Sequence, residues 1–172
     1  MSKFLDLINK QRSEKKEEKF EGTFLEYLEK LQEDPDIAKP AHKRLYDAIK
    51  NKGVNKMDND DPRKKKIFND DNIKIYDYFK DEFFGNERVI EKLMHFLKSA
   101  SLRGEESRQV LLLMGPVGAG KSALTEHIKD ALDGEVYYHL DGDPQKGEPL
   151  QLVPRSLRGN FEEMLGVKIE GD

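Results

Sequence analysis

The front of the chain carries apolar residues three or four positions apart, the spacing of one helix face. The first such set predicts a short helix, continued by the charged run 13–19, and consists of Phe4, Leu5 and Ile8. A second helix is predicted behind Thr23 and Glu26, which form a capping-box pair. Its apolar stripe consists of Phe24, Leu25, Leu28 and Leu31.

Two further helices follow the same periodicity. One begins near Pro40 and stops at Gly53, and its inward positions are Ala41, Leu45, Ala48 and Ile49. The segment 55–66 is charged and poor in apolar residues, so it predicts a linker or a mobile loop. The other helix follows Phe83, Phe84 and Gly85, with its apolar positions at Val89, Ile90, Leu93, Met94 and Leu97.

The pattern changes at 110–114, where five consecutive apolar residues predict a strand buried on both faces. A glycine-rich turn, a helix through Leu124, Ile128 and Leu132, and a second strand at 135–140 come next. Strand, turn, helix and strand in this order predict a βαβ unit with a parallel sheet. The region 141–153 contains prolines and is predicted to be irregular, and a last helix is predicted from Arg155 to Leu165.

The turn after the first predicted strand reads Gly115, Pro116, Val117, Gly118, Ala119, Gly120, Lys121 and Ser122, with Ala123 next in the helix. This matches the phosphate-binding pattern G-x-x-x-x-G-K-[ST] at every defined position. The glycines permit backbone conformations closed to other residues and a close approach to phosphate. Lys121 is predicted to reach the β- and γ-phosphates, and the Ser122 hydroxyl to bind Mg²⁺. The motif predicts a site for a nucleoside triphosphate, ATP with Mg²⁺.

Other candidates for chemistry are weaker. Asp141 and Asp143 flank Gly142 behind a predicted strand and invite comparison with a metal-binding acidic pair, but a plain turn is the better interpretation. The four histidines, His42, His95, His127 and His139, have no metal-ligand spacing, so a hydrogen-bonded or solvated role is expected for each. Catalytic residues are not identifiable.

Composition narrows the class of protein. The net charge of −4 gives no electrostatic case for nucleic acid, and the absence of cysteine excludes a disulfide or thiolate metal site within the 172 residues. No apolar stretch reaches the roughly 18 residues of a membrane helix, and the N-terminus lacks the apolar core of a signal peptide. We expect a cytoplasmic protein without a membrane partner.

Beyond these motifs, the chain resembles the N-terminal part of PrkA-type proteins, bacterial AAA+ ATPases described as serine protein kinases. The resemblance covers most of the chain, and the segments that carry it are 20–28, 41–46, 83–85, 111–118 and 148–154. It implies an α/β fold, in which a parallel-sheet P-loop unit of AAA+ type occupies residues 67–172. A helical region and charged linker, residues 1–66, would precede it.

The resemblance also implies functional properties. By analogy with AAA+ proteins, Phe84 and Gly85 line the adenine pocket, although core packing beneath the next helix is an equal alternative. A full-length relative is expected to act on a protein substrate and to form a homo-oligomer, whereas this chain, expected to be a truncated portion, should be monomeric. Walker B, sensor and arginine-finger residues have no candidates. The alternatives are a non-catalytic ATP-binding regulatory or assembly module, and part of an ATP-dependent protease or remodelling subunit.

Overall fold

The computed structural model describes residues 20–58, 60–62, 73–166 and 169. The helix predicted around Phe4–Ile8 lies outside these residues. The chain divides into two compact units. The terminal unit takes the residues up to Ala38 and those from Val136 onward, and the central unit is Lys39–Glu135. This division by packing does not test the predicted boundary at residue 66, which stays a prediction.

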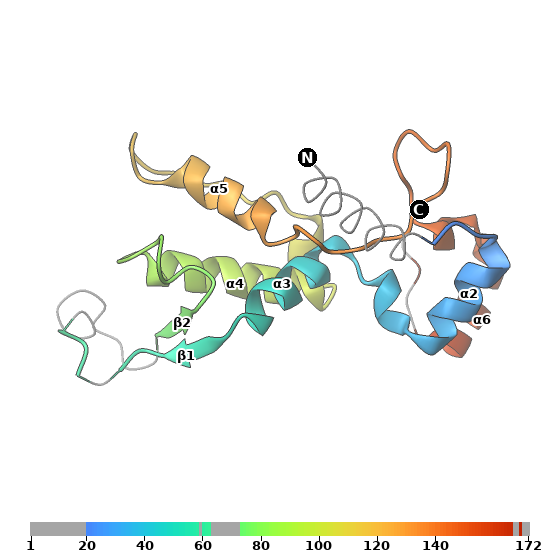
Figure 1. The fold of residues 1–172 in the computed structure, drawn as a ribbon, viewed down its shortest axis with the longest axis horizontal. Helices are drawn as coiled ribbons and strands as arrows, with labels where there is room; N and C mark the ends of the chain where they lie inside the picture. Colours follow the sequence, from blue (N-terminus) through green and yellow to red (C-terminus); the bar gives the residue numbers. More distant parts are fainter. Residues whose placement is uncertain (1–19, 59, 63–72, 167–168, 170–172) are drawn as a thin grey trace, which may run out of the picture. The chain divides into compact units, whose positions relative to one another are not determined.

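In its described residues, the terminal unit has two α-helices and two short 3₁₀ helices (Figure 1). These elements are α2 (Phe24–Glu33), η1 (Pro35–Ala38), η4 (Pro149–Leu152) and α6 (Arg155–Leu165). The capping box of α2 is confirmed, since the Thr23 N–H donates to the Glu26 carboxylate at 2.6 Å and the Glu26 N–H donates to the Thr23 hydroxyl at 3.4 Å. The core of the unit contains Tyr27, Leu31, Ala38, Leu150, Val153, Leu165 and Ile169.

The central unit packs helices around a long amphipathic helix (Figure 1). Its elements are α3 (Ala41–Asn51), β1 (Val54–Lys56), β2 (Lys74–Tyr76), α4 (Glu87–Ser101), η3 (Glu105–Arg108) and α5 (Lys121–Asp130). The predicted helix after Gly85 is confirmed as α4, which buries Ile90, Leu93, Met94, Leu97 and Ala100 along one face. The core adds Ile49 from α3, Leu124 from α5, and Tyr76, Phe79 and Phe83 from the segment before α4.

Strands β1 and β2 form an antiparallel pair in which Val54 lies opposite Tyr76 and Lys56 opposite Lys74. The linker predicted at 55–66 is therefore wrong at its start, because Asn55 and Lys56 belong to β1. Residues 59 and 63–66 of that segment lie outside the described ones.

The two strands predicted around the glycine-rich turn are not strands in the structure. Segments 110–114 and 135–140 have no ladder partner among the described residues, whose one sheet is the β1–β2 pair. Val110 is 92% exposed, Leu112 73% and Met114 85%. A strand is defined by hydrogen bonds to a neighbouring strand, and an apolar run alone does not supply that neighbour. The predicted parallel sheet is thus not seen in the part of the chain that the structure describes.

No helix among the described residues has both the length and the apolar character required to cross a membrane.

Candidate functional site

The glycine-rich turn forms a loop, 115–120, that leads into α5. Gly118 has a φ of +82° and Gly120 a φ of +77° with ψ of 12°, so both lie in the left-handed region. A Cβ added at either position would meet no atom within 4 Å. The need for glycine there is therefore conformational, because side chains rarely adopt this backbone geometry.

Gly115 differs from the other two glycines. Its backbone lies outside the left-handed region, and an added Cβ would lie 3.6 Å from the Ala119 Cβ, an ordinary van der Waals distance. The sequence pattern fixes glycine at 115 and 120 and leaves 118 open, whereas the left-handed backbone is found at Gly118 and Gly120.

The Lys121 ammonium lies inside the curve of the loop. Its Nζ donates to the Gly115 carbonyl at 2.9 Å and to the Pro116 carbonyl at 2.7 Å. The Ala119 N–H also donates to the Pro116 carbonyl, at 3.3 Å, which closes the turn beneath the ammonium. An ammonium group has three donors, so one remains for a further acceptor.

Helix α5 begins immediately after the loop. Its N-cap is Gly120, which has no side chain to cap the helix, and the first intrahelical bond runs from the Leu124 N–H to the Gly120 carbonyl at 2.8 Å. The N–H groups of the first turn, 121–123, therefore have no intrahelical acceptor. This is the positive end of the helix dipole, and Ser122 and Ala123 are exposed there.

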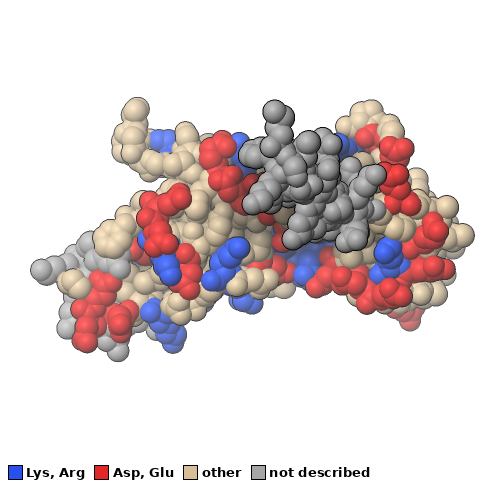
Figure 2. All heavy atoms as spheres, in the orientation of Figure 1, with Lys and Arg blue, Asp and Glu red and all other residues tan. Residues whose placement is uncertain are grey.

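These features fit an anionic ligand with a phosphate group. The end of the central unit that carries the loop is mostly uncharged in Figure 2, as its glycine-rich composition implies, and Lys121 supplies the positive charge. The Ser122 hydroxyl is an oxygen ligand of the type that Mg²⁺ accepts. Within the described residues, no group of three or more His, Cys, Asp or Glu side chains could hold a metal ion. A metal here would be held by Ser122 and by the ligand's own phosphates.

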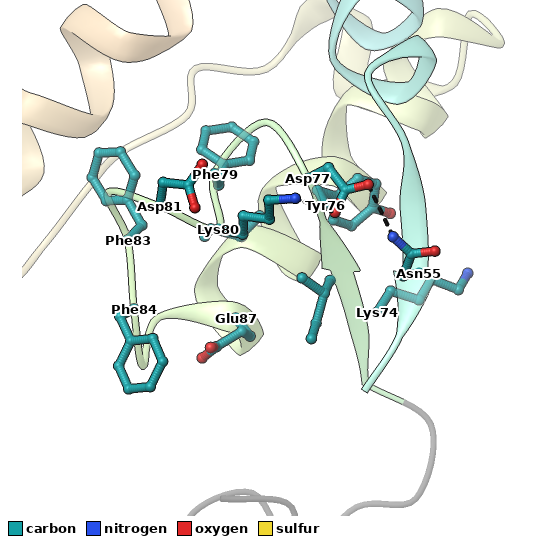
Figure 3. A pocket seen from close by; sticks show the side chains of 12 residues that line it. Asn55, Lys74, Tyr76, Asp77, Phe79, Lys80, Asp81, Phe83, Phe84 and Glu87 are labelled. Carbon is teal, nitrogen blue, oxygen red and sulfur yellow. Dashed lines mark hydrogen bonds and ion pairs between the residues drawn. The ribbon is translucent and has the colours of Figure 1, made fainter. Parts of the chain in front are cut away.

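The Phe83–Gly85 segment lies at the start of α4. Phe83 is buried in the core, but Phe84 is 72% exposed, and Gly85 has a φ of +84°. Core packing therefore describes Phe83 and not Phe84. Phe84 instead lines a cavity of about 370 Å³, together with Asn55, Lys74, Phe79, Phe83 and Glu87 among others. In Figure 3 the Phe84 ring and the Glu87 carboxylate lie beside one another at one end of this cavity.

This cavity and the glycine-rich loop are separate features. The residues of the loop do not line the cavity, whose walls come from β1, β2, the segment after β2 and the start of α4. The Asn55 amide donates to the Asp77 carboxylate at 2.9 Å on the far wall (Figure 3). The structure thus brings the loop residues 115–123 together at one place and puts Phe84 at another within the same unit.

Asp141 and Asp143 belong to the terminal unit and form the predicted turn. The Asp143 carboxylate accepts from the Gln145 N–H at 3.0 Å and from the Gly147 N–H at 2.6 Å. These bonds, above all that from Gly147, lower the pKa of the Asp143 carboxyl. The Asp141 carboxylate accepts from the Gly142 N–H at 2.9 Å. Both carboxylates therefore serve the local turn.

Sequence reasoning missed one contact of α5. His127 lies in a cluster with Tyr78 and Glu82, which precede it by 49 and 45 positions. The periodicity of one sequence carries no signal for a pairing between such distant positions. From the sequence, His127 could be predicted only to be hydrogen-bonded or solvated, without a named partner.

Comparison with known proteins gives the family context. Residues 22–172 match the PrkA AAA domain family. The chain is 37% identical over 174 residues to the ATP-dependent protease PrkA of Bacillus subtilis (strain 168). The aligned region covers 97% of this chain and 26% of that protein. It is 35% identical over 131 residues to the serine/threonine kinase YeaG of Escherichia coli (strain K12). That alignment covers 76% of this chain and 20% of the kinase.

A further relative is an uncharacterized protein in the gldA 5′ region of Geobacillus stearothermophilus, 38% identical over 90 residues, which are 52% of this chain and 79% of that protein. The chain spans only about a quarter of the length of the Bacillus protease and a fifth of the Escherichia kinase. No solved structure matches it.

Proposed function

Because the chain belongs to the PrkA AAA domain family, we propose that residues Gly115–Ala123 bind ATP with Mg²⁺. One observation carries the proposal: two left-handed glycines and the Lys121 ammonium meet at the uncapped start of α5. Backbone N–H groups at such a helix start bind phosphate in many folds. The family relation also supports a parallel P-loop sheet of AAA+ type, in which segment 110–114 would become a strand once a neighbouring strand pairs with it. The division into residues 1–66 and 67–172 rests on the change in composition along the chain, since the family match itself begins at residue 22.

Each residue of the loop has a role in this proposal. Gly118 and Gly120 set the backbone so that N–H groups face the β-phosphate, and the free donor of Lys121 binds the β- or γ-phosphate. Ser122 binds Mg²⁺ through its hydroxyl, and the ion keeps most of its water ligands. Phe84, exposed at the start of α4, and Gly85 are proposed to contact the adenine base.

Replacing Lys121 by alanine tests the phosphate site. We expect the loss of a charge-assisted contact to cost about 1.5–3 kcal/mol, hence roughly tenfold to more than a hundredfold in affinity for MgATP. Calorimetric titration would measure this. The matched control is Lys129→Ala, at the other end of α5, where the lysine pairs with Glu126 at 2.7 Å. Equal affinities for Lys121→Ala and Lys129→Ala would refute the assignment.

We further propose that the chain is the ATP-binding portion of a PrkA-like ATPase and serine protein kinase. The names of the relatives support two outcomes, since one is a protease and the other a kinase. A third outcome is a module that binds ATP without turnover. Single-turnover assays with γ-labelled ATP and a general protein substrate separate them, because they yield phosphoserine, free phosphate or no product.

We expect binding without steady-state hydrolysis from these 172 residues. The loop contacts hold the ground state and the transition state alike, and such uniform binding does not accelerate the chemical step. Acceleration requires groups aimed at the attacking water and at charge developing on the γ-phosphate. Hydrolysis that Lys121→Ala abolishes would contradict this expectation and point to a carboxylate that we have not identified.

A further inference from the structure

Helix α5 has few side chains that fix it to the central unit. Leu124 is its buried side chain, and Ile128 is half-buried against the same core. The position of the helix start, and therefore of Lys121 and Ser122, depends on how well these contacts and the polar ones beside them hold the helix. The polar contacts are concentrated at His127.

His127 and Tyr78 are joined by two hydrogen bonds in opposite directions. The Tyr78 hydroxyl donates to the His127 carbonyl at 2.6 Å, and the His127 Nε2 lies 2.8 Å from the Tyr78 carbonyl. A carbonyl only accepts, so Nε2 carries a proton and donates. Burial, followed by the nearby acidic groups, raises the pKa of the Tyr78 hydroxyl, which therefore stays protonated as a donor.

The imidazole is also enclosed by rings and faces a carboxylate. Its centroid lies 4.3 Å from that of Tyr78, 5.5 Å from Phe79 and 5.4 Å from Phe83. Its Nδ1 is 3.1 Å from the Glu82 carboxylate. The side chain of His127 is 15% exposed and that of Glu82 63%. One histidine of α5 thus contacts four residues of the turn 78–83.

This turn leads directly into Phe84 and Gly85. The Phe83 N–H donates to the Phe79 carbonyl at 2.9 Å, so the residues that His127 touches are bonded to those next to Phe84. On the other side, His127 stands six residues after Lys121, which is about 9 Å along a helix. His127 therefore links the helix that starts at the phosphate loop to the turn that ends at Phe84.

We propose that His127 is a positioning residue for nucleotide binding, which fixes the start of α5 relative to Phe84 and Gly85 so that the triphosphate and the base of one nucleotide are held together. The inference rests on the proposed function. His127 itself does not contact the nucleotide in this proposal. Losing its contacts with the turn 78–83 should weaken the binding of a ligand that reaches both the loop and Phe84, and should spare the binding of a ligand that occupies the loop alone.

The test compares MgATP with magnesium tripolyphosphate, which offers the same phosphates without a base. Calorimetry on the full 172-residue chain should show that His127→Ala weakens ATP binding about tenfold, and tripolyphosphate binding less than about twofold. His127→Gln, whose amide can still donate to the Tyr78 carbonyl, should recover part of the loss. The matched control is His95→Ala, an exposed histidine on α4, which should leave both affinities unchanged.

A second variant guards against misfolding of His127→Ala, which far-UV circular dichroism would reveal. Tyr78→Phe removes only the hydroxyl that bonds the His127 carbonyl, and it should show the same ATP-selective loss at smaller size. Equal weakening of both ligands, or of neither, in His127→Ala and Tyr78→Phe would overturn the inference and leave the proposed function standing. A wild-type chain that binds neither ligand would refute the proposed function and, with it, the role of His127.

Discussion

Gly120 is a position in the loop where the backbone conformation itself favours glycine. Its φ of +77° costs a side-chain-bearing residue about 1–2 kcal/mol. Because a Cβ there would meet no atom within 4 Å, no clash adds to that strain. Alanine also restricts the unfolded chain, which favours folding by about 0.4–1 kcal/mol and offsets part of the cost. We therefore predict that Gly120→Ala lowers the free energy of unfolding by up to about 1.5 kcal/mol.

Gly115→Ala is the matched control, because it introduces the same methyl group in the same loop. Its backbone is outside the left-handed region and its Cβ would make an ordinary contact with Ala119. The unfolded-state effect is shared by the two variants, so it cancels in their difference. Gly120→Ala should therefore be less stable than Gly115→Ala by the left-handed strain alone, about 1–2 kcal/mol.

Urea denaturation without nucleotide, followed by far-UV circular dichroism, measures this difference. Both glycines lie in the central unit, so one transition reports both variants. The slope of unfolding free energy against urea should be the same for the two proteins, since neither changes the surface exposed on unfolding. Gly120→Ala and Gly115→Ala of equal stability would refute the claim that the loop holds Gly120 in a left-handed conformation.

Three further predictions concern the framework. Hydrogen bonds from the Thr23 N–H and hydroxyl lower the pKa of Glu26, so the ionised carboxylate stabilises the fold above the ordinary pKa of 4.5 and this stabilisation is lost as the pH falls below 4.5. Glu26→Gln should therefore flatten the acidic part of a curve of unfolding free energy against pH. Lys74→Glu, which converts the like-charge pair with Lys56 into an opposite pair, should raise the free energy of unfolding by about 0.2–1 kcal/mol. Leu93→Ala in the core should cost about 2–5 kcal/mol by urea denaturation, whereas Leu102→Ala, 73% exposed, should change stability by less than about 0.5 kcal/mol.

The helices could be predicted because their signals are local. Thr23 and Glu26 are three positions apart and satisfy each other's N–H groups, and α6 runs over the predicted range Arg155–Leu165. In α4 the apolar residues recur at the period of the helix that they form. The sequence predicts Val89 as part of the same apolar face, but Val89 is 49% exposed. Periodicity gives the direction of the apolar face of a helix more accurately than the width of that face.

The strands could not be predicted in the same way. β1 and β2 are three residues each and are joined by pairing across 18 positions or more, so neither carries an alternation long enough to recognise. The run 110–114 has the composition of a buried strand. Whether it is buried on two faces depends on which other segments pack against it, and its own sequence does not determine that. The contact of His127 with Tyr78 is equally non-local.

The glycine-rich loop 115–120 has local determinants, as the helices do, but it follows a segment whose strand partners would be non-local. Its turn is set by two left-handed glycines and by three hydrogen bonds that span six positions or fewer. Its conformation therefore forms although the apolar segment before it has no strand partner among the described residues. Under the proposed function, binding of a bare triphosphate should depend on this local structure alone. Binding of a whole nucleotide should depend in addition on α5 holding its place against the turn before Phe84, so the ratio of the two affinities would measure how much of the site is encoded beyond the loop.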